Sequence, residues 1–496
     1  MQHSRFIING LILFFSMTLI IILTSGKETV TEPKPCGPTP SELQIEHHEM
    51  EFYGFIHFSL NTFSNKEWGY GNESPKLFNP KHLDCNQWAR VAKEAGMTGL
   101  ILTAKHHDGF CLWPSEYTDY SVKSSPWKDG KGDVLKEFSE ACKNNGIKMG
   151  LYLSPWDRHS AVYGTPAYIT YYRNQLKEIL THYGEVFEMW FDGANGGSGY
   201  YGGANETRKI DNKTYYDWPT TWALVRKLQP KVIRFSDAGP DIRWVGNEKG
   251  FAGETNWCLL KADEYYPGSP NHKNLTTGDE DGTKWIPAEC DVSIRPGWFY
   301  HKKEDKKVKS VEQLMDIYYK SIGRGATLLL NVPPDQNGVI HPTDVKRLQE
   351  FKTALKNEFP NNLAAGKAAK ADNWRGDDPR FAPGNVTDGN KESYWATDDG
   401  QKQGTITLNL GEETEVNRIV LQEYIRLGQR VKKFTVETLE NGQWVAKTGG
   451  TTIGYKRILK FPTTRTSAVR VKIEDSKACP VISNIELYRA PDKITY

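Results

Sequence analysis

Two carboxylates in this 496-residue sequence stand where chemistry is expected. The stretch FEMWFDGANGG, residues 187–197, is an alternating apolar segment that ends in a single acid, Asp192, followed by glycines. A buried charge is costly unless it is paired or used, so an acid at the end of an apolar strand needs a partner or a reaction. A second acid, Glu248, follows another short apolar segment in the stretch DIRWVGNEKG, residues 241–250.

Histidines and aromatic residues follow the other apolar segments at equivalent positions. These residues are His57, Glu67 and Trp68, then His106 and His107, Tyr152 and Trp156, Trp190, Arg243 and Trp244, and finally Trp298. Each position alone is weak evidence, because a histidine pair in a loop is usually structural. If the segments are neighbouring strands, however, all these side chains lie at one end of one sheet.

Several kinds of chemistry are disfavoured by the spacing of these residues. The sequence KHHDGF is not a metal-binding pattern such as HxH or HExxH, since adjacent histidines on a strand point to opposite faces. No GxSxG elbow and no phosphate-binding glycine loop follows a strand. Two carboxylates on neighbouring strand ends, among aromatic and hydrogen-bonding side chains, are typical of glycoside hydrolysis.

The elements that must position these residues alternate between strands and helices. Strands are predicted at residues 53–60, 98–105, 148–155, 186–193, 232–237, 256–260, 290–295 and 326–334. Amphipathic segments between them predict helices at 85–96, 133–146, 167–184 and 311–325. Eight strands alternating with helices over about 300 residues indicate an α/β fold, a (β/α)8 barrel with its active site at the strand carboxyl ends. A long polar insertion is expected at 261–288, and a doubly wound open sheet is the competing arrangement.

Composition and the amino-terminal segment give broader limits. The net charge of +2 gives no reason to expect a nucleic-acid partner. Residues 1–26 carry Arg5 and then a long apolar run that ends in small residues, which predicts a secretion signal. An uncleaved membrane anchor is the alternative. The seven cysteines are scattered without CxxC spacing, so neither a disulfide framework nor a cysteine-bound metal is expected.

The composition changes near residue 360. The rest of the chain has few helical patterns and contains alternating segments such as GTITLNLG, EVNRIVLQEYI, KKFTVETLENGQW and AVRVKIED, separated by turn residues. This pattern predicts a second domain, an antiparallel β-sandwich of jelly-roll type.

Six segments of the chain resemble glycoside hydrolase family 29, the α-L-fucosidases. They are GFIHFSLNTF, EWGYG, TAKHHDGFCLWPS, WFDGANG, RWVGNE and GATLLLNVPPDQNG. The likeness covers about residues 45–355. WFDGANG and GNE look like the subfamily that is selective for α1,3- and α1,4-linked fucose on branched glycans, and the broad-specificity subfamily is the alternative.

The resemblance implies a role for each matching residue. Asp192 is then the nucleophile and Glu248 the general acid and base of a retaining double displacement, with Glu254 and Glu289 as rival candidates for the acid. Histidines that donate hydrogen bonds to the sugar hydroxyls, and tryptophan faces that cover its methyl group, surround the fucose. The implied fucose-binding residues are His57, Glu67, Trp68, His106, His107, Tyr152, Trp190, Arg243 and Trp298. Catalysis is expected to need no metal or organic cofactor.

Residues 365–490 resemble the discoidin or coagulation factor 5/8 type C domain, a group that includes carbohydrate-binding modules. The matching segments are NVTDGNKESYWAT, GTITLNLG, VNRIVLQE and ISNIELY. The resemblance implies a structural calcium ion near Asp388, Ser393 and Glu486, held by oxygen ligands. The alternative is that TDGN is only a turn. Sugar binding by this domain is left open.

Four segments and one function are therefore expected. The segments are a signal peptide at 1–26, a linker at 27–44, the barrel at 45–358 and the β-sandwich at 359–496. The function is that of a secreted or periplasmic exo-α-L-fucosidase that removes α1,3- or α1,4-linked fucose from Lewis-type oligosaccharides or glycoproteins. The enzyme meets a membrane only if the signal segment stays uncleaved. A catalytically silent fucose-binding protein is the alternative from another class, and the presence of both acids argues against it.

Overall fold

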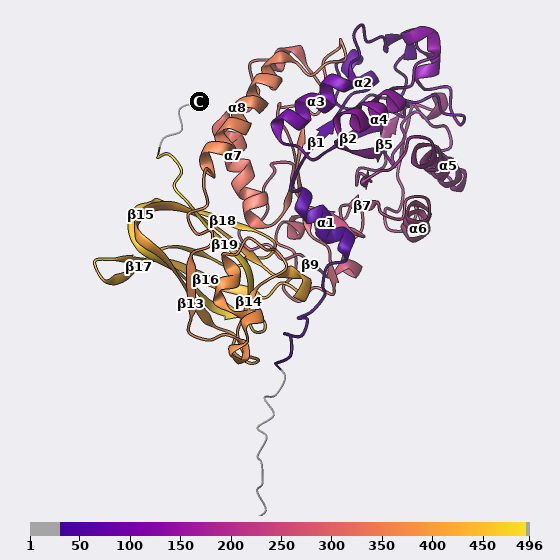
Figure 1. Cartoon of the computed structure of the whole chain (residues 1–496). Helices are drawn as coiled ribbons and strands as arrows, with labels where there is room; N and C mark the ends of the chain where they lie inside the picture. Colours follow the sequence, from indigo (N-terminus) through magenta and orange to yellow (C-terminus); the bar gives the residue numbers. More distant parts are fainter. Residues whose placement is uncertain (1–29, 493–496) are drawn as a thin grey trace, which may run out of the picture. The chain divides into compact units, whose positions relative to one another are not determined.

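Eight parallel strands form a closed barrel in the computed structural model, which describes residues 30–492 (Figure 1). The barrel strands are β1 (Phe52–Ile56), β2 (Gly99–Lys105), β3 (Lys148–Leu153), β4 (Glu188–Trp190), β7 (Ile233–Ser236), β8 (Ile242–Trp244), β11 (Ala288–Ser293) and β12 (Thr327–Asn331). The first strand closes the barrel against the last, with Phe52 paired to Leu328 and Phe55 to Asn331. The predicted α/β barrel is confirmed, and the open doubly wound sheet is wrong.

Eight α-helices are described around and before these strands. They are α1 (Glu42–Met50), α2 (Leu60–Ser64), α3 (Cys85–Ala95), α4 (Val134–Asn145), α5 (Pro166–His182), α6 (Trp218–Leu228), α7 (Val311–Lys320) and α8 (Pro342–Glu358). The bounds of α3 follow from its caps, because the Asp84 side chain accepts the N–H of Gln87 and Gly96 ends the helix in a left-handed conformation. Buried residues on one face of each outer helix pack toward the strands.

The sixth barrel strand differs from the prediction. Residues 256–260 were expected to form it, but Leu259–Leu260 is β9, which pairs antiparallel with β10 (Lys284–Trp285) outside the barrel. The sixth strand is β8, which follows β7 after only five residues, with no helix between them. An alternating strand and helix pattern cannot locate a three-residue strand placed in this way. The insertion therefore runs from the end of β8 to the start of β11.

The barrel interior is a column of side chains rather than an open channel. Its apolar members are Met50, Tyr53, Phe55, Ile101, Tyr152, Trp190, Ile233, Phe235, Ile242 and Leu329. Because strand side chains alternate between faces, Glu188, Trp190 and Asp192 point the same way from β4 and its extension. The first of these lies low in the barrel and the last at its carboxyl end.

The second domain is an antiparallel β-sandwich, as predicted. Its strands are β13 (Ala368–Ala371), β14 (Trp395–Ala396), β15 (Gly404–Glu423), β16 (Val431–Glu440), β17 (Gln443–Gly450), β18 (Arg457–Ser476) and β19 (Val481–Tyr488), in the order β14-β19-β15-β18-β16-β17 with β13 paired to β15. Segments predicted as separate strands merge into β15 and β18. Register shifts between Asn409 and Thr414 let these long strands continue through turn-like residues. Trp395, Phe434 and Ile473 contribute to a separate core.

Side chains of the sandwich hydrogen-bond to backbone groups of the barrel insertion, inside one compact unit that begins at Pro33. Gln429 of the sandwich accepts the N–H of Cys258 at 2.8 Å and donates to the carbonyl of Asn256 at 2.9 Å. Thr452 accepts the N–H of Asn256 at 3.0 Å. The sandwich therefore completes the hydrogen bonding of a barrel insertion.

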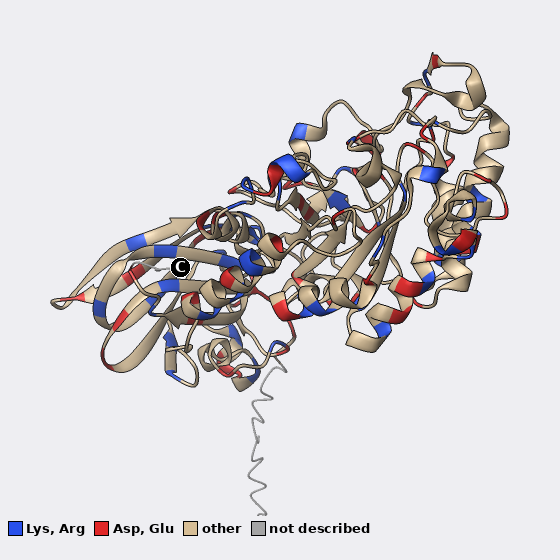
Figure 2. Ribbon diagram, turned by 90° about the horizontal axis from the view of Figure 1, so that it is seen from above, with Lys and Arg blue, Asp and Glu red and all other residues tan. Residues whose placement is uncertain are grey.

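Charges of both signs are intermingled over the helices and strands of both domains (Figure 2). This distribution agrees with the small net charge. The predicted signal peptide lies outside the described residues. Within residues 30–492, no helix has the length and apolarity of a membrane span.

Candidate functional site

A cavity of about 420 Å³ opens at the carboxyl end of the barrel. Nine of the residues predicted from the sequence line it: His57, Glu67, Trp68, His106, His107, Trp190, Asp192, Glu248 and Trp298. They come from three strand ends and three connecting loops, which are far apart in the chain. The fold thus brings both proposed catalytic acids and most of the proposed sugar contacts to one cavity.

Asp192 lies just beyond β4 with both carboxylate oxygens engaged. Its Oδ1 accepts the N–H of Ala194 at 2.7 Å, and its Oδ2 accepts the hydroxyl of Tyr152 at 3.0 Å. His107 Nε2 lies 3.8 Å from the same Oδ2. Burial raises the pKa of Asp192, and the two donors act against that rise by stabilising the carboxylate. Tyr152 does not line the cavity itself and instead supports this acid.

Glu248 faces the same cavity from the loop after β8. Its Oε2 accepts the indole N–H of Trp298 at 3.1 Å. Burial raises the pKa of Glu248, and the charges of Asp192 and Glu67 raise it further against the indole donor. A carboxyl in this setting holds its proton more strongly than a free glutamate does, which suits a general acid.

The rival acids lie elsewhere. Glu254 is 69% exposed and sits 3.8 Å from Arg457 of the sandwich. Glu289 is fully buried below the cavity, where it accepts the indole N–H of Trp190. Of the three candidates for the acid, the cavity lining includes only Glu248.

Three neutral histidines present defined ring nitrogens to the cavity. Burial lowers the pKa of His57 and of His107 to about 3, and that of His106 well below its usual value. His107 Nδ1 lies 2.7 Å from Ser154 Oγ, and that hydroxyl donates to the carbonyl of Trp156. The hydroxyl must therefore accept from Nδ1–H, which leaves Nε2 of His107 as an acceptor.

The same reasoning assigns the other two rings. Asn331 donates both amide hydrogens elsewhere, so its Oδ1 accepts from Nδ1 of His57 at 2.9 Å, and the Nε2 of His57 is also an acceptor. The Asn61 amide points at Nδ1 of His106 from 3.4 Å, which leaves the proton on Nε2. The expectation that the histidines donate to the sugar therefore fits His106, while His57 and His107 accept.

Glu67 fixes the loop that carries Trp298. Its Oε2 accepts the backbone N–H of Trp298 at 2.8 Å, and its Oε1 lies 2.5 Å from His301 Nε2. Trp68, next in the chain, is 53% exposed and stands edge-on to His107 at a ring distance of 5.2 Å. The pair therefore joins two walls of the cavity, with the Trp68 ring at its mouth.

Arg243 is the one predicted cavity residue that the fold keeps away from the cavity and its acids. Its guanidinium is fully buried and donates to the carbonyls of Leu275, Ile286 and Trp257 and to Asn256 Oδ1. Adjacent strand residues point to opposite faces, so Trp244 faces the cavity and Arg243 faces the insertion. Sequence alone did not locate β8 and therefore did not reveal this alternation.

Trp244, which the sequence placed at a strand end, also lines the cavity. Several further lining residues were not predicted: Phe55, Gly193, Ala194, Asp237, Gly268, Ser269, Pro270, His272 and Asp291. Trp244 donates to Asp291 at 2.7 Å, and Asp237 accepts the N–H of Gly268 at 2.8 Å. A Cβ on Gly193 would lie 2.0 Å from Asp237 Oδ2, so only glycine fits beside the proposed nucleophile. An acid directly after β7 was the one available signal for Asp237.

Two of the residues proposed to hold calcium lie in one turn. Ser393 Oγ donates to Asp388 Oδ2 at 2.7 Å and to the carbonyl of Asn390 at 2.9 Å, so this turn gathers several oxygens. Glu486, the third proposed ligand, accepts hydrogen bonds from Asn484 and Tyr488 on its own strand. The turn offers the oxygen donors that calcium prefers.

Comparisons with known proteins agree with the two-domain fold. The model of the Alpha-L-fucosidase family matches residues 40–358, and that of the F5/8 type C domain matches residues 367–486. "Alpha-L-fucosidase 1" of Arabidopsis thaliana is 42% identical over 485 residues, which cover 96% of this chain and 93% of that protein.

Two solved structures are similar over almost the whole chain. A glycoside hydrolase 29 family member from an unknown rumen bacterium is 49% identical with a TM-score of 0.83, covering 93% of this chain and 79% of that one. A Ruminococcus gnavus GH29 fucosidase in complex with fucose is 36% identical with a TM-score of 0.83, covering 94% and 98%. The chain therefore belongs to the alpha-L-fucosidase family, glycoside hydrolase family 29, and is an α-L-fucosidase that carries a C-terminal F5/8 type C domain.

Proposed function

We propose that this fucosidase works by a retaining double displacement with Asp192 as nucleophile and Glu248 as general acid and base. The observation that carries the proposal is the contrast between two carboxyls on one cavity. Burial raises the pKa of both acids, but Asp192 accepts two hydrogen bonds that favour its charged form, whereas Glu248 accepts one and neighbouring charges raise its pKa further. Such a division separates an ionised nucleophile from a protonated acid.

The two steps follow from these roles. In the first, an oxygen of Asp192 bonds to the anomeric carbon while the glycosidic C–O bond breaks, and Glu248 passes its proton to the departing oxygen. In the second, Glu248 takes a proton from water, the water oxygen bonds to the same carbon, and the Asp192 ester bond breaks. The fucose hydroxyls meet acceptor nitrogens of His57 and His107 and the N–H of His106.

Proton NMR of the first product tests the stereochemistry. Retention predicts that α-L-fucose forms first and then mutarotates. Early accumulation of β-L-fucose would contradict a covalent intermediate on Asp192, although the protein would remain a fucosidase.

We further propose selectivity for α1,3- and α1,4-linked fucose on branched glycans. Its support is the resemblance of WFDGANG and GNE to that subfamily, together with a polar wall on the leaving-group side. Ser269 and His272 of the insertion line the cavity beside Trp244 and Glu248. The distinguishing assay compares a Lewis-type trisaccharide, an α1,2-linked fucosyllactose and an aryl fucoside. Comparable rates on all three would favour the broad-specificity alternative.

Calcium in the C-terminal domain, at Asp388, Ser393 and Glu486, is a separate proposal supported by the oxygens that the turn from Asp388 to Ser393 gathers. Added Ca²⁺ should raise the melting temperature of the wild-type protein, and Asp388→Ala should abolish that rise. Equal melting curves in Ca²⁺ and in chelator would leave TDGN as a turn.

The predicted signal peptide supports a secreted or periplasmic enzyme. Amino-terminal sequencing of the mature protein should begin near residue 27. A mature protein that keeps residues 1–26 would support the membrane-anchor alternative.

A further inference from the structure

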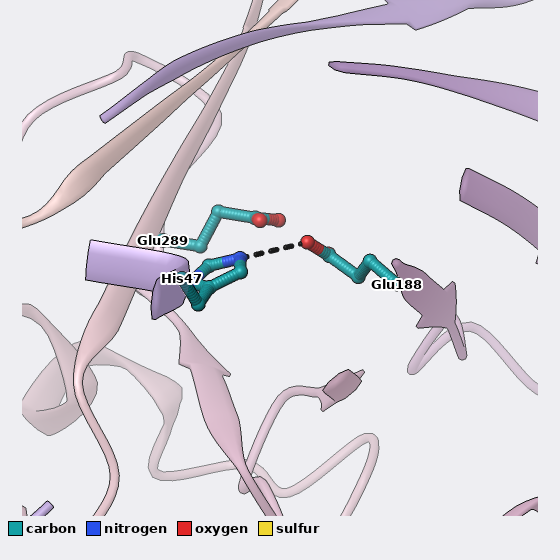
Figure 3. A group of neighbouring side chains, drawn as sticks. All are labelled: His47, Glu188 and Glu289. Atoms are coloured by element: carbon teal, nitrogen blue, oxygen red, sulfur yellow. Dashed lines mark hydrogen bonds and ion pairs between the residues drawn. The ribbon is translucent and has the colours of Figure 1, made fainter. Parts of the chain in front are cut away.

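Beneath the sugar cavity, two buried glutamates and a histidine lie together at the amino end of the barrel. Their ligating atoms all lie within 4.8 Å of one another, and all three side chains are buried (Figure 3). His47 comes from α1, Glu188 from the start of β4 and Glu289 from the start of β11. His47 Nε2 lies 2.9 Å from Glu188 Oε2. None of these groups has a role in the mechanism above.

Glu289 joins this cluster to the cavity. Its Oε1 accepts the indole N–H of Trp190 at 2.8 Å, and its Oε2 accepts the hydroxyl of Tyr53. Glu188 lies on the same strand face as Trp190 but is not hydrogen-bonded to its indole. The two glutamates thus share one environment, while only Glu289 contacts a residue of the cavity wall.

The Trp190 ring has no polar anchor other than Glu289 among the hydrogen bonds of the described residues. Phe235 stacks on it with a centroid distance of 4.0 Å and an interplanar angle of 10°, and Phe55 contacts it at 5.3 Å. Stacking allows an indole to slide in its plane, whereas an N–H bonded to a fixed carboxyl sets its position. Trp190 also stands two residues before Asp192 on the same strand face.

We infer that Glu289 is a positioning residue for the fucosidase reaction: held by Tyr53, it fixes the Trp190 indole that walls the sugar cavity. This inference rests on the proposed placement of fucose against Trp190. Glu188 and His47 complete the cluster below without touching the cavity.

Protons rather than a metal ion account for the cluster best. The Tyr53 hydroxyl already bridges two of the three ligating groups, since it lies 3.1 Å from His47 Nε2 and donates to Glu289. Burial lowers the pKa of His47 to about 4 and raises that of Glu188 to about 8. Burial and the charge of Glu188 raise the pKa of Glu289 as well. Near neutral pH the pair therefore retains protons, and Glu188 Oε1, which has no hydrogen-bond partner among residues 30–492, is tolerated as part of a neutral carboxyl.

The test compares changes at the two glutamates, with kcat and KM measured on an aryl α-L-fucoside. Glu289→Leu removes the acceptor and should raise KM about 3- to 10-fold, the range for one lost hydrogen bond. Glu289→Gln keeps an acceptor oxygen and should stay within about twofold of wild type. The matched control, Glu188→Gln, changes the same cluster without touching the indole and should leave KM unchanged.

A second readout follows the indole directly. In protein labelled with ¹⁵N-tryptophan, the Nε1–H signal of Trp190, assigned by its loss in Trp190→Phe, should shift in Glu289→Gln and not in Glu188→Gln. This readout remains usable if Glu289→Leu fails to fold. In the Trp190→Phe background, which lacks the N–H, replacement of Glu289 by Leu should have no further effect on KM.

Three results would overturn the inference. The first is an indole signal that does not move in Glu289→Gln. The second is a rise of KM in Glu188→Gln as large as that in Glu289→Leu. The third is one bound metal ion per chain that is lost in Glu188→Gln. A different result is expected if fucose does not lie against Trp190. In that case Trp190→Ala would leave KM unchanged, while the indole signal of Trp190 would still shift when Glu289 is replaced.

Discussion

At the carboxyl end of the barrel, Asp192 and Glu248 face a cavity of about 420 Å³, while at the amino end Glu188 and Glu289 face each other beneath α1. Both ends combine two carboxyls with histidine and tryptophan. The upper pair meets different hydrogen-bond donors and faces open space, which is the basis for the proposal that one acid is ionised and the other protonated. The lower pair is buried away from water, and burial favours the protonated, uncharged form of its carboxyls. The two ends of the barrel therefore use the same types of residue. They differ in access, since the upper pair faces the cavity and the lower pair is buried.

The largest effect is expected from Asp192→Ala. Loss of the nucleophile should reduce kcat by about 10³-fold or more while fucose binding stays measurable by calorimetry. Alanine is preferred to asparagine because deamidation would regenerate aspartate. Asp237→Asn is the matched control, since this acid lines the same cavity but accepts a backbone N–H from Gly268. An equal loss in both variants would remove the distinction between the two acids.

Glu248→Gln should have the next largest effect. We expect a loss of roughly 10²- to 10³-fold on glycosides that need protonation, and a smaller loss on an aryl fucoside with an acidic leaving group. Because Glu248 must be protonated and its pKa is raised, wild-type activity should fall as the pH rises through that pKa. Glu248→Gln should flatten this alkaline limb.

Glu254→Gln serves as the control for the acid. This glutamate is exposed beside Arg457, so its replacement should change the rate by less than about twofold. A large loss there, with Glu248→Gln near wild type, would reassign the acid.

Gly193→Ala should displace the backbone beside Asp192, at the carboxyl end of the barrel. The added Cβ would lie 2.0 Å from Asp237 Oδ2 and must displace the segment beside Asp192. A shift of that kind is expected to reduce kcat about 10- to 100-fold. Gly193→Ala combined with Asp237→Ala makes room and should recover part of the rate. No recovery would mean that the contact with Asp237 is not the cause.

Glu188→Gln tests the lower end, where stability rather than rate should respond. The pKa of Glu188 rises from 4.5 to about 8 on folding, so between these values the folded protein keeps a proton that the unfolded chain releases. The free energy of unfolding of the wild type should therefore fall as the pH rises from 5 to 8. The variant lacks this contribution and should gain relative to wild type by on the order of 2 kcal/mol over that range. Urea denaturation at both pH values measures the difference, and parallel curves would contradict it.

The ends of the long strands and helices were predicted from the sequence more accurately than the short, irregular elements. Strands such as β2 and helices such as α3 carry strong periodicity and clear caps, so they were placed within a few residues. The three-residue β8 carries neither signal. Because β8 was not predicted, the alternation of side chains along it could not be used, and Arg243 was wrongly assigned to the cavity.

The same limit applies to the cavity lining. Asp192 and the histidines follow obvious strands and could be named in advance. Asp291 lies inside β11, where an acid looks like any interruption of an apolar run, and His272 belongs to an insertion without periodicity. Only the barrel closure brings them beside Glu248.

The hydrogen bonds of Gln429 and Thr452 to Asn256 and Cys258 bear on whether the sandwich could be exchanged for another domain. Asn256 also accepts from Arg243, whose strand leads to Glu248. A gene fusion that exchanged the sandwich for another module would leave three backbone groups near that strand without partners, unless the newcomer supplied equivalent side chains. The C-terminal domain is therefore joined to the barrel by hydrogen bonds that a replacement domain would have to reproduce.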